Sequence, residues 1–140
     1  MKYRFPLLLM CLALPTNALA GQNFSRSLTE CSAIYTALLV RPAAIAGNTA
    51  DDSARIKDTA VAYLDRAMKE ARREGHAQPV LRVSSQHYQL MVKWTPKVYA
   101  AASVAETRDW LDYCDRFGSN LGLPSLRKPD DQRVGWLVDQ

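Results

Sequence analysis

The sequence predicts an all-α protein, a compact bundle of about four helices closed by one disulfide. Apolar residues recur at helical spacing in several stretches, and Ser-x-x-Glu signatures and glycines mark the ends of these stretches. Two cysteines, Cys31 and Cys114, fall on the apolar stripes of two predicted helices. Together these features favour helices that pack through their apolar faces and are joined by a covalent bridge.

The first 20 residues have the form of a cleaved secretory signal peptide. Lys2 and Arg4 precede an apolar run at 5–14, and Ala18-Leu19-Ala20 supplies the small residues of a cleavage site. The run is too short to span a bilayer. We therefore expect residues 21–140 to form a single exported domain that is not inserted in a membrane, in the periplasm or, alternatively, outside the cell.

Composition excludes one large class of partners. Removal of residues 1–20 leaves 120 of the 140 residues, with 16 basic and 14 acidic side chains and a net charge of +2. Nucleic-acid binding requires a concentrated basic face, so we expect no nucleic-acid partner. The sequence also has no Cys-x-x-Cys-His motif and no Gly-rich phosphate loop, and no cofactor is predicted.

The first two helices are expected at about residues 28–40 and 51–73. In the first, Ser27 and Glu30 have the spacing of a capping box, and Pro42 ends the helix. In the second, Asp51 and Asp52 lie in the first turn, charged pairs four residues apart line the polar face, and Gly75 follows the last turn.

The third and fourth helices are expected at about residues 79–94 and 103–121. In the third, the apolar positions at helical spacing are Val83, His87, Leu90, Met91 and Trp94. An extended segment at Val80–Val83 is the alternative for its start. Ser103 and Glu106 form a second capping-box signature, and Gly118 or Gly122 ends the fourth helix. A polar tail follows from about residue 125 to 140. Four residues at inward positions are expected to be buried: Leu64, Met68, Trp110 and Phe117.

Removal of the leader takes away Cys11 and leaves Cys31 and Cys114 as the two cysteines of the exported chain. Disulfides form and persist in exported proteins. There is no Cys-x-x-Cys motif that would suggest redox catalysis. The sequence therefore predicts a structural Cys31–Cys114 disulfide.

Chemically active groups are few. His87 and Met91 lie four residues apart and are weak candidate ligands for a soft metal, although two ligands do not make a site. A row of carboxylates recurs every third residue, and this spacing drifts around a helix rather than converging. An ordinary solvated face explains the row better than catalysis. The row comprises Glu106, Asp109, Asp112 and Asp115.

The C-terminal tail carries the sequence's candidate partner-binding residues, an apolar cluster of Trp136, Leu137 and Val138. Either this cluster packs on the bundle or it anchors a partner, because tryptophan is an effective interface residue.

Three functions remain open at this stage. The first is a protein-binding role, such as that of an inhibitor, an immunity protein or a chaperone-like protein. The second is a carrier of a metal or a small apolar ligand, and the third is an enzyme. In size, leader and cysteine count the chain is similar to small helical periplasmic proteins with one disulfide, which include acid chaperones and immunity or inhibitor proteins.

Overall fold

The computed structural model describes residues 23–40 and 50–126, and these form four α-helices without a strand. The helices are α1 (Phe24–Leu39), α2 (Ala50–Arg73), α3 (Pro79–Lys97) and α4 (Val104–Ser119), and a short 3-10 turn, η3 (Ala101–Ser103), precedes α4. The predicted all-α class with about four helices is confirmed. The predicted leader and the candidate residues Trp136, Leu137 and Val138 lie outside the described residues.

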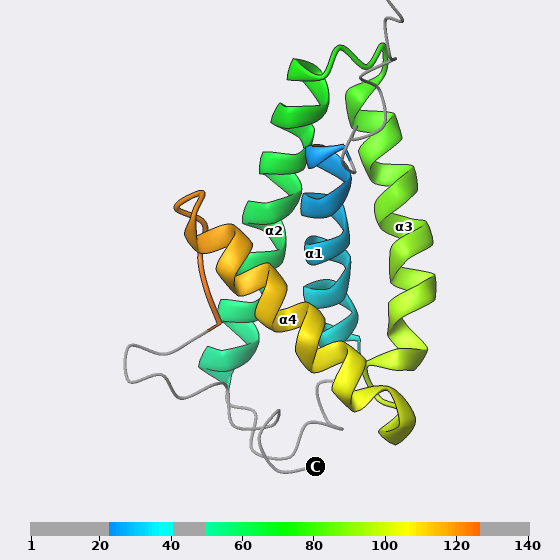
Figure 1. Ribbon diagram of the computed structural model, residues 1–140, viewed down its shortest axis with the longest axis vertical. Coiled ribbons are helices and arrows are strands. Elements are labelled where there is room, and N and C mark those ends of the chain that lie inside the picture. Colours follow the sequence, from blue (N-terminus) through cyan, green and yellow to red (C-terminus); the bar gives the residue numbers. More distant parts are fainter. Residues whose placement is uncertain (1–22, 41–49, 127–140) are drawn as a thin grey trace, which may run out of the picture.

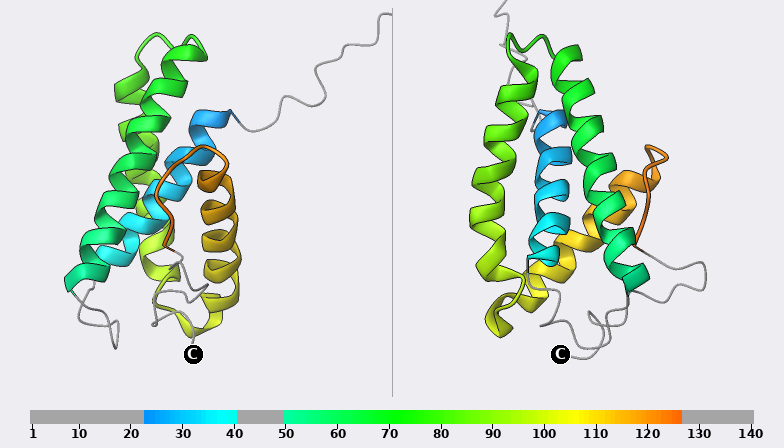
Figure 2. Two further views of the ribbon diagram at one scale, coloured as in Figure 1. Left: turned by 90° about the vertical axis from the view of Figure 1, so that its left-hand side faces the viewer. Right: turned by 180° about the vertical axis from the view of Figure 1, so that it is seen from behind.

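The helices are arranged around α1. Helices α2 and α3 form a long antiparallel hairpin, and α1 lies against both of them (Figure 1). Helix α4 crosses α1 diagonally on the side opposite the hairpin (Figure 2). Because α1 is enclosed in this way, twelve of its sixteen residues are buried.

Helix α1 starts one turn before the expected position. It begins at Phe24, after Asn23, so Ser27 lies inside the helix and is not its cap. The capping-box interpretation of Ser27 and Glu30 was wrong, because α1 begins one turn before them and Glu30 binds residues of another helix. The Glu30 carboxylate accepts hydrogen bonds from Lys93 Nζ at 2.8 Å and from Trp94 Nε1 at 3.2 Å, both on α3.

Helix α2 is terminated by Gly75, as the sequence predicted. Gly75 has φ of 78°, which is the left-handed conformation that glycine adopts at low cost. The amide of Gly75 donates to the Arg72 carbonyl, and that of His76 donates to the Ala71 carbonyl. This pair of bonds is the Schellman motif. Pro79 then starts α3, so the alternative of an extended segment at Val80–Val83 was wrong.

Helix α4 begins where the sequence predicted and ends at Ser119. Ser103 occupies the N-cap position, but its side chain makes no capping hydrogen bond. Glu106 instead accepts two hydrogen bonds from Lys97 Nζ, at 2.7 and 2.8 Å. Of the two glycines proposed to end the helix, Gly122 does so with φ of 67°, whereas Gly118 is inside α4.

The core is built on α1 and the inner sides of its neighbours. Its largest fully buried side chains are Trp94, Tyr35 and Tyr63. The four residues expected to be buried (Leu64, Met68, Trp110 and Phe117) are only partly buried and pack against the edge of this core. Aromatic rings in edge or stacked contact continue along α4, in the order Trp94, Trp110, Tyr113, Phe117 and Phe24.

The predicted disulfide is present. Cys31 on α1 and Cys114 on α4 are both fully buried, and their Cα atoms are 5.6 Å apart. The bridge joins the crossing helix to the central helix over a sequence separation of 83 residues. A cross-link of this span removes much of the freedom of the unfolded chain.

Opening the disulfide should therefore destabilise the fold strongly. We expect Cys114→Ser to lower the free energy of unfolding by roughly 4 kcal/mol, because a long loop opens and Cys31 loses its partner. Denaturant unfolding of the variant, compared with oxidised and reduced wild type, measures this. The reduced wild type should resemble the variant. Equal stability of oxidised wild type and variant would contradict the prediction.

Close packing of Gly118 against Tyr63 is a second connection between α4 and the rest of the bundle. The Tyr63 hydroxyl, on α2, donates a hydrogen bond to the Cys114 carbonyl on α4. Burial raises the pKa of Tyr63 to about 12, which keeps the hydroxyl protonated as a donor. A Cβ atom at position 118 would overlap Tyr63 Oη and Cζ. Only glycine therefore lets the tyrosine approach the α4 backbone this closely.

Gly118→Ala should destabilise the protein, although alanine is normally the better helix former. Overpacking of this kind costs about 1–3 kcal/mol. A double-mutant cycle with Tyr63→Phe tests the cause, because removal of Oη relieves the closer of the two overlaps with the methyl group. We expect Gly118→Ala to cost less when Tyr63→Phe is also present. Equal costs with and without Tyr63→Phe would show that the clash is not the reason.

Candidate protein-binding surface

The candidate metal ligands His87 and Met91 lie on the side of α3 that packs toward α1. His87 is half-buried, and its Nε2 is 3.3 Å from Thr36 Oγ1 on α1. Burial lowers the pKa of His87, although a hydrogen bond with the Ser32 backbone acts in the opposite direction. Met91 is partly buried one turn further on. Among the described residues, no group of three His, Cys, Asp or Glu side chains is placed to hold a metal ion.

The carboxylate row on α4 points in different directions. Glu106 pairs with Lys97, and Asp109 is exposed. Asp115 is buried, and it accepts hydrogen bonds from the Tyr35 hydroxyl at 3.1 Å and the Leu126 amide at 3.2 Å. Burial, and then the negative charge of Asp115, raise the pKa of Tyr35 well above its ordinary value. Asp115 is therefore a structural acceptor between helices.

Ser25, Glu74 and His76 form a polar cluster where α1 meets the α2–α3 turn. Glu74 Oε2 accepts from Ser25 Oγ at 2.6 Å and lies 3.1 Å from His76 Nε2, and Glu74 Oε1 accepts from the Ser25 amide at 2.9 Å. The carboxylate lies between the hydroxyl and the imidazole. This order is unlike that of a nucleophilic triad, in which the imidazole contacts the hydroxyl. The cluster instead holds the first helical turn of α1 against the loop that joins α2 to α3.

The most unusual surface of the described protein is the outward side of α3. Leu81, Tyr88 and Val92 are 64%, 70% and 59% exposed, respectively. With the exposed Ser85 they follow the spacing i, i+4, i+7 and i+11, so they form one stripe on the helix. We call these four residues the outer face of α3. Helix α3 forms one edge of the bundle, with α1 and α2 on its inner side (Figure 1).

The charged residues of α3 are all basic. No Asp or Glu occurs between Glu74 and Glu106, although the chain has 14 acidic residues. Arg82 and Lys93 lie beside the stripe and are exposed. Lys93 is bound to the buried Glu30, whereas no described carboxylate forms an ion pair with Arg82. The outer face is thus mostly apolar, and Arg82 beside it carries a positive charge that no described carboxylate pairs with.

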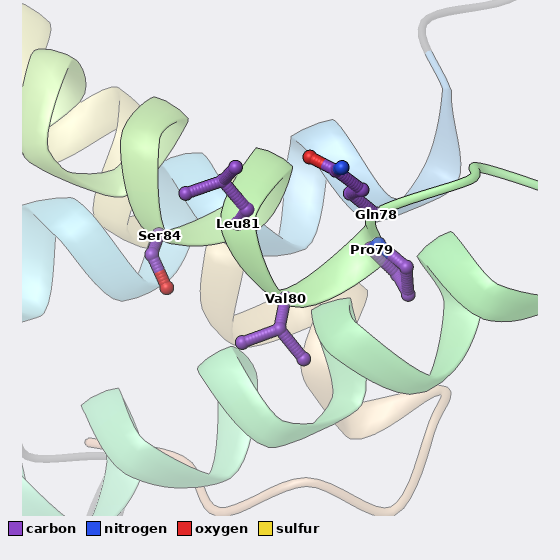
Figure 3. A pocket seen from close by; sticks show the side chains of 5 residues that line it. All are labelled: Gln78, Pro79, Val80, Leu81 and Ser84. Atoms are coloured by element: carbon purple, nitrogen blue, oxygen red, sulfur yellow. The ribbon is translucent and has the colours of Figure 1, made fainter.

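Two shallow hollows flank Leu81 at the start of α3. One is mostly apolar and is lined by Gln78, Pro79, Val80, Leu81 and Ser84. Figure 3 shows Val80 and Ser84 on one side of the helix and Leu81 on another. The second hollow is more polar and lies on the other side of Leu81, where its lining includes His76, Arg82 and Ser85.

Sequence reasoning missed this surface because it assigned one apolar stripe to each helix. For α3 that stripe was Val83, His87, Leu90, Met91 and Trp94, which lie toward the rest of the bundle. A second stripe at 81, 88 and 92 is visible in the same residues. Helices with apolar residues on two sides bury both sides or use one of them for binding.

The polar cluster at Glu74 generates a pH-dependent prediction. Burial would raise the pKa of Glu74, but hydrogen bonds from Ser25 and His76 outweigh it and the pKa is lowered below its ordinary value of 4.5. A lowered folded-state pKa gives stability that is present above the ordinary value and lost as the pH falls through the folded value. Glu74→Gln should therefore lower the melting temperature at neutral pH by roughly a few degrees.

The difference between wild type and Glu74→Gln should shrink as the pH falls below 4.5. Thermal melts across the acid range test this, with Asp65→Asn on the exposed side of α2 as the control. A gap that is constant with pH would mean that the Glu74 charge does not hold the first turn of α1.

Comparison of the chain with models of known protein families, with curated proteins and with solved structures finds no match. What this protein does must therefore be argued from its own surface and chemistry.

Proposed function

We propose that this chain is an exported helical protein that acts by binding another protein, and that the outer face of α3 is its binding surface. The observation that carries the proposal is the exposure of Leu81, Tyr88 and Val92 along one side of one helix. Contiguous exposed apolar patches of this kind are typical of interaction sites.

The energetic argument favours a protein partner. Burial of a large apolar side chain contributes about 1.5–3 kcal/mol, so a partner that covers the stripe gains from three residues at once. Tyrosine is frequent among residues that dominate binding energy. A rigid helix also presents these residues at a fixed spacing, as a groove or a second helix requires.

The proposed export rests on the leader and on the cysteines. Lys2, Arg4 and the apolar run at 5–14 precede a small-residue cleavage site. The buried disulfide fits an oxidising compartment such as the periplasm. None of the described helices is both long and apolar enough to cross a membrane. Inhibitor, immunity and chaperone-like proteins all act through such protein contacts.

We propose binding rather than catalysis for a geometric reason. Two constellations in the described structure have the residue types of general acid–base chemistry, and neither has its geometry. The α4 carboxylates diverge, with Asp115 committed to Tyr35 and Leu126. In the Ser25–Glu74–His76 cluster the hydroxyl donates to the carboxylate and not to the imidazole.

Site-specific photocrosslinking from the outer face tests the proposal. A photoreactive phenylalanine analogue at position 88 of the full chain, produced in its native host, should cross-link to a defined polypeptide. The same analogue at Val61 is the matched control, because this valine is 50% exposed on α2. Leu81→Ser in the same chain should reduce the product from position 88 about tenfold, since an apolar anchor is lost.

Two results would contradict the proposal. One is equal cross-linking from positions 61 and 88. The other is a product from position 88 that Leu81→Ser leaves unchanged. Intact mass of the recovered protein tests the export component. The expected form starts at Gly21 and gains the mass of the bridge hydrogens on reduction, whereas a retained Met1 would overturn export.

A further inference from the structure

The start of α3 combines an apolar hollow with a more polar one that is lined in part by Arg82. Leu81 separates the hollow at Val80 and Ser84 from the hollow at Arg82 and Ser85. Gln78 and Leu81 line both hollows, so a single partner segment lying over Leu81 contacts both. The partner must therefore supply apolar and polar groups within a short stretch of its own chain.

The partner's polar group that best fits the hollow at Arg82 is a carboxylate. Acidic residues near the α2–α3 turn are already occupied. Glu70 pairs with Arg66 and Arg73, and Glu74 binds Ser25 and His76. In contrast, Arg72 and Arg82 are exposed and form no ion pair with a described carboxylate. The turn thus has unpaired positive charge, and the described acidic groups around it are engaged elsewhere.

The remainder of the outer face limits the partner further. On the C-terminal side of Arg82 the stripe continues with Ser85, Tyr88 and Val92, and none of these residues carries charge. A phosphate backbone needs cations repeated along its path, and this face does not repeat them. A segment with apolar residues at helical spacing does match Leu81, Tyr88 and Val92.

We infer that the partner presents an acidic amphipathic segment to α3. One of its apolar side chains enters the hollow beside Val80, and an Asp or Glu carboxylate meets Arg82. This inference rests on the proposed function, and it adds the chemistry of the partner. A bidentate arginine–carboxylate pair sets the register of the segment, and the apolar stripe supplies most of the contact area.

Designed helical peptides test the inference with the full mature, disulfide-bonded chain. Three labelled peptides share one apolar stripe and differ only at the flanking positions, which are all Glu, all Gln or all Lys. Fluorescence anisotropy gives the dissociation constants. We expect the Glu peptide to bind about tenfold more tightly than the Gln peptide and the Lys peptide to bind most weakly. Added salt should reduce the preference for Glu.

Variants assign the effect to residues. Arg82→Glu should remove the preference for the Glu peptide or reverse it, whereas Lys57→Glu on the exposed side of α2 should not. Tyr88→Ser should weaken all three peptides, and Val61→Ser should weaken none. Circular dichroism of every variant checks that the bundle is folded.

Each alternative outcome has a distinct meaning. Equal affinities for the Glu and Gln peptides, with loss of both in Tyr88→Ser, would overturn the acidic partner and leave the proposed binding face standing. Failure of the Glu peptide to bind overturns the inference as well. A wild-type dimer that Tyr88→Ser dissociates would assign the face to a second copy of this chain and overturn the acidic partner. Binding that is insensitive to Tyr88→Ser would count against the proposed function itself.

Discussion

The burial of α1 constrains every other part of the fold. A helix enclosed by three others must find a partner for each of its polar side chains, because an unpaired buried group is costly. Four polar groups of α1 illustrate the solution. The Ser25 hydroxyl donates to Glu74, and the Ser32 hydroxyl donates to the Ala60 carbonyl. The Glu30 carboxylate accepts from Lys93 and Trp94. The Thr29 hydroxyl donates to the Ser25 carbonyl within α1 itself. The bonds that Ser25, Ser32 and Glu30 make outside α1 fix its position along and around the hairpin, which nonspecific apolar packing alone does not specify.

Helix α4 is attached to this arrangement by a small number of specific connections. The disulfide joins it to Cys31, Asp115 joins it to Tyr35, and the Cys114 carbonyl accepts from Tyr63. All three lie within two residues of position 114, so they act as one anchor at the point where α4 crosses α1. The buried Leu126, held through its amide by Asp115, extends the same anchor to the segment that follows the helix. The aromatic contacts with Phe24 and Trp94 then set the direction in which α4 leaves the crossing.

The same architecture explains why α3 is available for binding. Its inner side is occupied by α1, through Trp94 and His87. Its opposite side is not packed against the described bundle, yet it carries the apolar residues Leu81, Tyr88 and Val92. A surface chosen for solubility alone would be charged, as α2 is on its exposed side. The proposed binding role of the outer face would give this apolar side a physical reason to face solvent.

The amino-acid sequence alone was sufficient to predict the four helices, the termination of α2 by Gly75 and the pairing of Cys31 with Cys114, and it offered Gly122 as one of two possible ends of α4. These features depend on local periodicity, on backbone conformation and on the number of cysteines that remain if the predicted leader is removed. The roles of Ser27, Glu30 and Glu106 could not be predicted from their spacing, which indicated caps, because tertiary partners such as Lys93 and Lys97 compete for the same polar groups. The sequence indicated the inward side of α3 through Val83 and Trp94, but it did not reveal that a second apolar side would remain exposed. Both stripes of that helix are visible in its residues, and only packing against α1 decides that Trp94 is buried while Tyr88 remains in solvent.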